Sequence, residues 1–170
     1  MEFNIDIQRA IEVASKIRLL ALDVDGILTD GRLFFSNHGE ELKTFHTLDG
    51  HGINMLHERN IEVAIITGRT STILEQRAAE LNIVNVYQGC CNKLSSLNAI
   101  VEKQSYSISE IAYAGDDVPD LNALRAVGLS FSVPNAHPTV KAAVDIITSL
   151  SGGWGAVREI SDFILESQKK

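Results

Sequence analysis

Carboxylates, one hydroxyl and one lysine recur in this sequence directly after apolar runs or at the start of helical segments. Asp23-Val24-Asp25-Gly26 follows the first apolar run, Thr67 ends the second, and Lys93 opens a helical segment. Gly115-Asp116-Asp117 follows a later run, with Asp120 one helical turn further on. Each pattern is weak alone, since Asp-x-Asp-Gly is more often a solvated turn. If the runs are parallel strands of one sheet, these groups meet at the edge where ligands bind in such folds.

A group of carboxylates at one edge of a sheet requires a cation. Asp23 and Asp25 are two residues apart, so their side chains share a face if the backbone stays extended as far as Asp25. Asp116 would approach from another strand. Two carboxylates about 4 Å apart repel by about 4 kcal/mol at an effective dielectric constant of about 20. Oxygen ligands without a His or Cys set favour a hard ion, and we expect Mg²⁺ rather than Ca²⁺ or Zn²⁺.

With a cation present, one carboxylate is free for covalent chemistry at phosphorus. Aspartate forms an aspartyl-phosphate, which divides a difficult hydrolysis into two easier steps. A second carboxylate two residues on can give a proton to the leaving oxygen and later take one from water. The Thr67 hydroxyl and the Lys93 charge suit the phosphoryl oxygens, where charge gathers in the transition state. Asp23, Asp25, Thr67 and Lys93 therefore form a predicted phosphoryl-transfer site.

The elements that must position these groups alternate along the chain. Apolar runs predict strands at 19–24, 63–67, 84–87, 111–114, 129–133 and 145–147, and helical periodicity predicts helices at 6–16, 52–59, 72–81, 93–102, 120–127, 139–143 and 155–168. Such alternation is typical of an α/β, doubly wound (Rossmann-like) parallel sheet with helices on both faces. Thr72 and Glu75 predict a capping box at the third of these helices. Two strand-like pieces, 32–36 and 41–47, predict a β-hairpin that projects after the first strand.

Composition limits the remaining possibilities. The chain has 170 residues, 45% of them hydrophobic, and a net charge of −7. We expect one domain over residues 1–170, with an N-terminal helix in 1–17 and a C-terminal tail and helix in 151–170. No run is long enough to span a bilayer and no signal peptide is evident, so we expect a cytoplasmic protein. An acidic chain without a Lys/Arg cluster argues against a nucleic-acid partner. The adjacent Cys90 and Cys91 read as packing or loop residues.

The motifs resemble those of the haloacid dehalogenase superfamily of aspartyl phosphatases. Asp23-Val24-Asp25-Gly26 is similar to the first motif, Thr67 to the second, Lys93 to the third, and Gly115-Asp116-Asp117 with Asp120 to the fourth. The resemblance implies that Asp23 is the nucleophile and Asp25 the acid/base. It also implies that Mg²⁺ is held by the Asp23 carboxylate, the Asp25 carbonyl and Asp116, while Asp117 and Asp120 support the acidic loop.

Within that superfamily the chain is most similar to the capless 3-deoxy-D-manno-octulosonate 8-phosphate phosphatases of lipopolysaccharide synthesis. The similarity is carried by Asp25 to Gly31, Asn37 to Glu41, Asp49 to Ile53, Thr67 to Arg69, Tyr87 to Gly89 with Asn92 and Lys93, and Gly152 and Gly153 followed by Gly155 to Glu159. The resemblance implies a homotetramer in which a neighbour's hairpin or tail closes the site. It implies substrate contacts at Asp25, His46, Thr47, Leu48, Asp49, Gly50, Arg69, Arg77 and Lys93.

Some positions depart from the family pattern. Many members have Arg where this chain has Leu48 and Asn54, which removes a charge contact with the substrate. A nine-carbon keto-deoxy sugar phosphate is therefore an alternative substrate, although Arg69 argues for the eight-carbon sugar. Trp154 stands where small or charged residues are usual, and it is open whether it stacks on the sugar or packs at a subunit interface.

Two other classes of function are alternatives. A signalling receiver domain also combines an acidic cluster, a Thr or Ser and a Lys, but the acid/base at Asp25 argues for fast turnover instead. A phosphatase-like module that serves only oligomerisation is the third reading, and the intact catalytic positions argue against it.

Overall fold

The computed structural model describes residues 1–169, and Lys170, the last residue of the expected tail, lies outside them. The strands are β1 (Glu2–Phe3), β2 (Leu19–Leu22), β3 (Phe34–Ser36), β4 (Gly39–Leu42), β5 (Glu62–Ile66), β6 (Asn85–Tyr87), β7 (Ile111–Ala114), β8 (Leu129–Ser132) and β9 (Ile146–Ile147). The helices are α1 (Ile7–Ala14), α2 (Thr47–Glu58), α3 (Thr72–Glu80), α4 (Lys93–Gln104), α5 (Leu121–Leu124), α6 (Pro138–Lys141) and α7 (Ala156–Ser167). Three short helical turns are η1 (Val24–Leu28), η2 (Ile108–Glu110) and η3 (Val118–Asp120).

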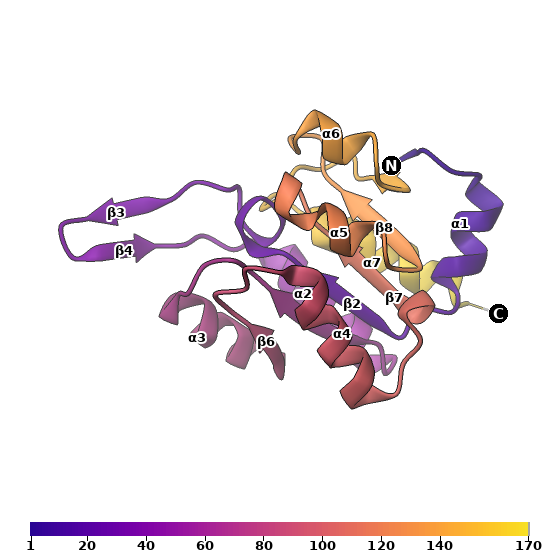
Figure 1. Cartoon of the computed structure of the whole chain (residues 1–170), viewed down its shortest axis with the longest axis horizontal. Coiled ribbons are helices and arrows are strands. Elements are labelled where there is room, and N and C mark those ends of the chain that lie inside the picture. The colour runs from indigo at the N-terminus through magenta and orange to yellow at the C-terminus, as the bar shows by residue number, and fades with distance from the viewer. Residues whose placement is uncertain (170) are drawn as a thin grey trace.

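A seven-stranded sheet forms the centre of the fold, in the order β1-β9-β8-β7-β2-β5-β6 (Figure 1). Its strands pair in parallel except β1, which pairs antiparallel with β9 at the edge. The sequence did not predict β1, which has only two residues. The central strand β2 lies between β5 and β7, so the ends of these three strands lie next to one another.

Helices cover both faces of the sheet, and the two faces take alternate residues of β2. Leu20 and Leu22 belong to a core shared with α1, α2, α3 and α7. Leu19 and Ala21 belong to a second core shared with α4, α5 and α6. All four β2 side chains are buried, because a strand covered on both faces has no side exposed to water. The doubly wound α/β prediction is confirmed.

The start of α2 and the cap of α3 differ from the sequence prediction. Helix α2 begins at Thr47 rather than at residue 52, because the His46 Nδ1 accepts a hydrogen bond from the Leu48 amide (3.3 Å) and caps an extra turn. The capping box at Thr72 was wrong: Ser71 is the cap of α3, and its hydroxyl accepts from the Leu74 amide at 3.4 Å. Glu75 instead accepts a hydrogen bond from Gln88 at 3.0 Å.

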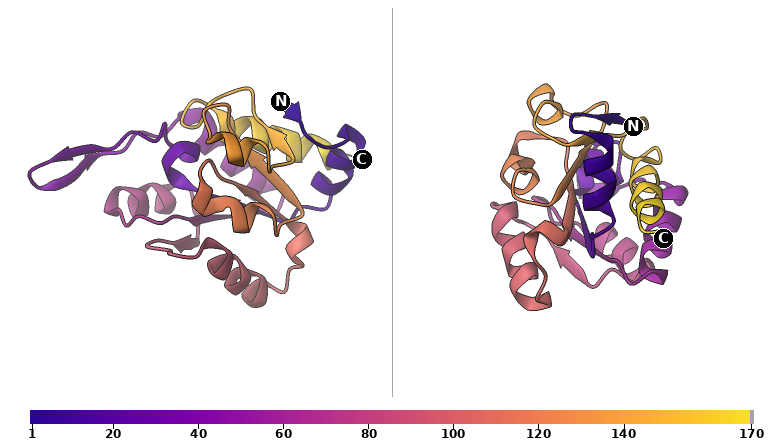
Figure 2. Two further views of the ribbon diagram at one scale, coloured as in Figure 1. Left: turned by 45° about the horizontal axis from the view of Figure 1, so that its top comes forward. Right: turned by 90° about the vertical axis from the view of Figure 1, so that its right-hand side faces the viewer.

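The predicted hairpin is formed by β3 and β4, which pair only with each other among the described residues. It extends far from the body of the molecule, as the left side of Figure 1 and the left view of Figure 2 show. Its strands are shorter than predicted and meet at a tight turn through Asn37 and His38. Phe34, Phe35 and Leu42 expose 42%, 59% and 50% of their surfaces. In the described part of the chain, none of the helices has the length and apolar character that a membrane crossing requires.

Candidate active site

An open pocket of about 510 Å³ lies beyond the carboxyl ends of β2, β5 and β7. Its lining includes Asp23, Asp25, Thr67, Arg69, Lys93, Asp116, Asp117 and Asp120, together with Gly31, Gly68, Cys90, Cys91 and Pro119. The topology brings these residues together because neighbouring parallel strands end at the same edge. The predicted catalytic and metal-ligating residues therefore share one pocket.

Lys93 joins two of the carboxylates. It is the first residue of α4 and is only 7% exposed. Its Nζ lies 2.8 Å from Asp23 Oδ1 and 2.7 Å from Asp120 Oδ1. Burial alone would lower the pKa of Lys93, but the two carboxylates outweigh it and raise that pKa. Lys93 therefore stays an ammonium and fixes one oxygen of Asp23.

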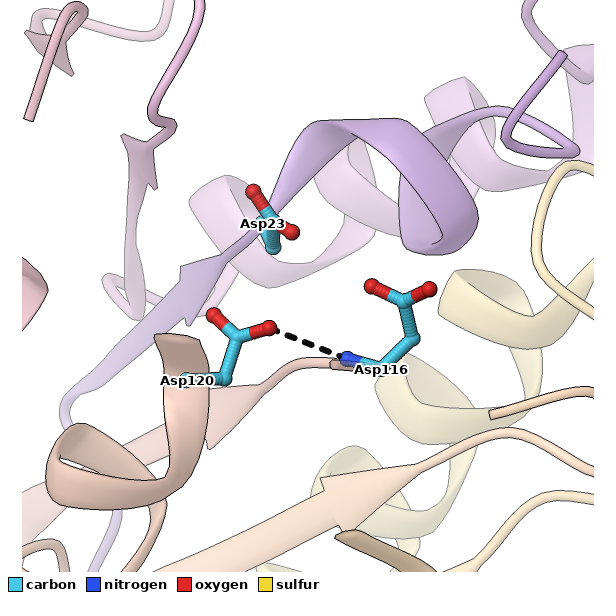
Figure 3. A group of neighbouring side chains, drawn as sticks. All are labelled: Asp23, Asp116 and Asp120. Atoms are coloured by element: carbon cyan, nitrogen blue, oxygen red, sulfur yellow. Dashed lines mark hydrogen bonds between the residues drawn. The ribbon is translucent and has the colours of Figure 1, made fainter. Parts of the chain in front are cut away.

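Asp120 organises the loop that follows β7. It is fully buried, and its Oδ1 also accepts a hydrogen bond from the Tyr113 hydroxyl at 2.7 Å. Its Oδ2 accepts from the Asp116 and Asp117 amides, each at 3.2 Å; Figure 3 draws the bond to Asp116. Asp117 is exposed and caps η3 by accepting from the Val118 amide at 2.7 Å. Asp120 thus holds the loop after β7 through two backbone amides, and Asp117 caps the turn that follows.

Asp23 and Asp116 have the properties of cation ligands. With Asp120 they offer carboxylate oxygens within 4.8 Å of one another, and Figure 3 shows the three side chains around a common centre. The buried Asp116 Oδ1 has no hydrogen-bond partner among the described residues. Burial, with the nearby carboxylates, raises the pKa of Asp23 to about 6 and that of Asp116 to about 7. Because Asp120 already accepts four hydrogen bonds, Asp23 and Asp116 are the two carboxylates that fit a divalent ion.

The expectation that Asp23 and Asp25 share an extended strand was wrong. Strand β2 ends at Leu22, and the chain then enters the wide turn η1, in which Gly26 has φ +99°. Asp25 still lines the pocket, but its carboxylate is held by other groups: Lys43 pairs with Oδ1, and Arg69 Nε lies 3.7 Å from Oδ2. The turn separates the roles of the two aspartates, since each has its own cationic partner.

Lys43 was not predicted from the sequence. It lies just after β4, within Leu42-Lys43-Thr44, and nothing local distinguishes it from a surface lysine. In the structure it is 8% exposed, and its partner Asp25 is 18 residues earlier in the chain. No sequence signal was available, because the contact depends on where the hairpin rejoins the body.

The other side of the pocket is formed by the segments after β5 and β6. Thr67 is 2% exposed, and its Oγ1 accepts a hydrogen bond from the Arg69 amide at 3.4 Å. The Arg69 side chain is 41% exposed and reaches over the Phe35 ring at 5.5 Å. Cys90 and Cys91 are free thiols that line the pocket, which the sequence analysis did not predict.

The segment from His46 to Gly50 and Arg77 does not line this pocket in the described chain. His46, Asp49, Gly50 and Arg77 border a separate small cavity of about 10 Å³, and Thr47 and Leu48 are exposed. Asp49 is 1% exposed, and its Oδ1 accepts from the Arg158 amide at 2.8 Å at the start of α7. Burial raises the pKa of Asp49. Within one chain, therefore, the Asp49 carboxylate caps a helix.

The start of the C-terminal tail packs against the turn η1 and the residues that follow it. A Cβ at Gly152 would overlap the Gly26 carbonyl, and one at Gly153 would overlap the backbone at Thr29 and Asp30. These two positions are therefore restricted to glycine by close backbone contact. Trp154, which follows, is 63% exposed and borders a hollow of about 360 Å³ with Phe34, Phe45, His46 and four other residues.

Comparison with known proteins places this geometry among phosphatases. Residues 78–157 match the haloacid dehalogenase-like hydrolase family. The chain is 48% identical over 157 residues to 3-deoxy-D-manno-octulosonate 8-phosphate phosphatase KdsC of Salmonella typhi, covering 92% of this chain and 84% of that protein. It is 46% identical over 160 residues to KdsC of Escherichia coli K12, covering 94% of this chain and 85% of that protein.

Solved structures agree with the sequence comparison. The 3-deoxy-D-manno-octulosonate 8-phosphate phosphatase of Moraxella catarrhalis, solved with a magnesium ion, a phosphate ion and KDO, superposes with a TM-score of 0.93 at 42% identity, covering 96% of this chain and 94% of that one. A cobalt-bound enzyme from Haemophilus influenzae has a TM-score of 0.90 at 42% identity, with 92% and 91% coverage.

Proposed function

Because the chain belongs to the haloacid dehalogenase-like hydrolases, and within them to the 3-deoxy-D-manno-octulosonate 8-phosphate phosphatase family, we propose that it hydrolyses this sugar phosphate at the acidic pocket. It is a Mg²⁺-dependent phosphoric monoester hydrolase, and the whole chain, 1–170, serves as one phosphatase domain without a cap. The observation that supports this most strongly is the Lys93 ammonium, which pairs with both Asp23 and Asp120 beside Asp116, whose Oδ1 has no hydrogen-bond partner among the described residues.

Asp23 is the nucleophile in this proposal. Lys93 holds Oδ1 of Asp23 at 2.8 Å, so the attack on phosphorus falls to the other carboxylate oxygen. The bond between phosphorus and the sugar oxygen breaks as the aspartyl-phosphate forms, and Asp25 gives its proton to the leaving oxygen. Asp25 then takes a proton from water, which attacks phosphorus, releases phosphate and restores Asp23.

The ion would be held by the Asp23 carboxylate, the Asp116 carboxylate and the Asp25 carbonyl. When bound, Mg²⁺ neutralises the clustered carboxylates and the phosphoryl oxygens. The Thr67 hydroxyl and the Lys93 ammonium hold the remaining phosphoryl oxygens, and both side chains are almost fully buried. Such fixed dipoles and charges stabilise a transition state more than mobile ones, because they need no rearrangement during the reaction.

The sugar-acid part of the substrate is assigned to a wider set of residues. Arg69 borders the pocket and is exposed enough to contact a carboxylate. The resemblance also assigns substrate contacts to His46, Thr47, Leu48, Asp49, Gly50 and Arg77, and we propose a homotetramer in which a neighbour's hairpin or tail closes the site. The projecting hairpin, with Phe34, Phe35 and Leu42 exposed, supports such an assembly, since exposed apolar patches commonly mark interfaces. The two free cysteines suit a cytoplasmic protein.

The nine-carbon alternative rests on Leu48 and Asn54, which are both exposed and carry no charge. Discrimination between the two sugars is the ratio of their kcat/KM values. A higher kcat/KM on the nine-carbon substrate would make it the preferred one, and Arg69 predicts the opposite result.

The test is phosphate release from a panel of keto-sugar phosphates, with and without Mg²⁺, by the wild type and Asp23→Asn. We expect turnover of the eight-carbon substrate that needs Mg²⁺ and that Asp23→Asn abolishes. Asp162→Asn, on the exposed side of α7, is the matched control and should retain activity. Turnover near the wild-type level in folded Asp23→Asn would exclude the mechanism, and no release from any substrate would favour the non-catalytic reading.

A further inference from the structure

The carboxylate of Asp25 is held on both oxygens by cations that depend on the hairpin. Lys43, one residue after β4, pairs with Oδ1, and Arg69 Nε lies 3.7 Å from Oδ2. Arg69 in turn lies over the ring of Phe35 in β3, 5.5 Å from its centroid. The hairpin therefore contacts the proposed acid/base in two ways. Lys43, at the end of the hairpin, pairs with Asp25 directly, and Phe35 contacts Asp25 through Arg69.

The two cations differ in how firmly they are placed. The Lys43 side chain is 3% exposed, whereas that of Arg69 is 41% exposed. An ion pair shielded from water is screened less than an exposed one, so the pair of Lys43 with Asp25 is the firmer of the two. An exposed arginine exchanges partners at little cost. Lys43 is therefore the cation that stays with Asp25 when substrate engages Arg69.

The backbone around Asp25 gives the side chain little help. Asp25 lies inside η1 with φ −77° and ψ 109°, outside the helical region, and Gly26 follows with φ +99°. The turn is closed elsewhere, where the Thr29 amide donates to the Val24 carbonyl at 3.0 Å. The direction of the Asp25 carboxylate thus depends on its side-chain partners.

From these contacts we propose that Lys43 is a positioning residue, which holds the Asp25 carboxylate where it can exchange a proton with the leaving oxygen. The inference rests on the proposed function, because it acts through the acid/base role of Asp25. It also links the hairpin to catalysis. The position of the hairpin determines the position of Lys43, and Lys43 in turn orients the proton donor Asp25.

A positioning role has a signature that a purely structural role lacks. A sugar alkoxide is a poor leaving group and needs a proton from the general acid. An aryl oxide such as p-nitrophenolate leaves without one. Misplacing Asp25 should therefore slow hydrolysis of the sugar phosphate far more than hydrolysis of p-nitrophenyl phosphate. Loss of the fold or of the metal site would slow both substrates equally.

The experiment measures kcat and KM of Lys43→Met and Lys43→Arg on both substrates with saturating Mg²⁺. Lys43→Met should lower kcat on the sugar phosphate by about 10- to 100-fold, with little change in KM and a much smaller loss on the aryl phosphate. Lys43→Arg should recover most of the loss, because it keeps a cation at the site. Lys141→Met is the matched control. Lys141 is the last residue of α6, and its ammonium donates a hydrogen bond to the Pro134 carbonyl, away from the pocket.

The outcomes separate this proposal from the proposed function. If the wild type hydrolyses the sugar phosphate and Lys43→Met slows both substrates by the same factor, the positioning role is wrong and the function stands. If the wild type fails on the sugar phosphate, the function itself fails. Should Lys43→Met not fold, Lys43→Gln takes its place, because it removes the charge and keeps a polar side chain. A larger fall in kcat on the sugar phosphate than on the aryl phosphate supports the role, and an equal fall on both substrates contradicts it.

Discussion

Gly26→Ala tests whether the turn after β2 is shaped around the metal ligands. Gly26 has φ +99°, and a Cβ built on it would overlap the Asp116 carboxylate, whose more distant oxygen is only 2.9 Å away. Non-bonded carbon and oxygen atoms prefer about 3.5 Å or more, so the carboxylate would have to retreat by roughly 1 Å. Asp116 cannot do this without leaving its place beside Asp23.

The expected loss has two parts that a control can separate. A positive φ at alanine costs about 1 to 3 kcal/mol of stability, and a displacement of about 1 Å in a catalytic group can cost about 100-fold in rate. Gly39→Ala is the matched control, because Gly39 has φ +109° but a Cβ there would meet no atom within 4 Å. The two variants share the backbone strain, and only Gly26→Ala displaces the ligand.

The assay is a Mg²⁺ titration of phosphatase activity, with thermal unfolding measured in parallel. Gly26→Ala should require at least about tenfold more Mg²⁺ for half-maximal activity and lose about 100-fold in kcat/KM. Gly39→Ala should lose stability while keeping its Mg²⁺ requirement. If the two variants differ by less than about twofold both in kcat/KM and in the Mg²⁺ concentration for half-maximal activity, the reasoning that Gly26 makes room for Asp116 is refuted.

Three further predictions follow from the same geometry. The metal-free protein should lose stability as pH rises from about 4 to about 7, because burial raises the pKa of Asp23 to about 6 and of Asp116 to about 7. The folded state then holds protons that the unfolded state releases; thermal unfolding in EDTA checks this, and a Tm that rises over that range would contradict it. Asp120→Asn weakens the ion pair with the buried lysine, so activity should fall by about tenfold or more, with a lower Tm; unchanged kinetics would show that the pair is dispensable. Ser71→Ala should destabilise the fold by about 1 kcal/mol in urea unfolding, whereas Thr72→Ala should not, since only Ser71 caps α3.

Much of the site was predictable because its residues follow strands in short local motifs. The apolar run at 19–22 and the alternation of strands and helices indicate a parallel sheet, and that topology alone brings Asp23, Thr67, Lys93 and Asp116 to one edge. Residue type then suggests the chemistry, since clustered carboxylates favour a hard cation. These inferences need no coordinates, because the period of the pattern and the position of a residue at the end of a strand are both visible in the sequence.

The tertiary structure decided how those residues are partnered. The chain enters the turn η1 after β2, and there Lys43 and Arg69 hold Asp25 while Lys93 holds Asp23. Asp49 matched a substrate-binding position, yet within the chain its carboxylate caps α7. Such pairings join residues far apart in the sequence, and they depend on how a turn directs the backbone and where a hairpin rejoins the body. Neither property is encoded in a local pattern, so only the folded chain determines which cation holds which carboxylate.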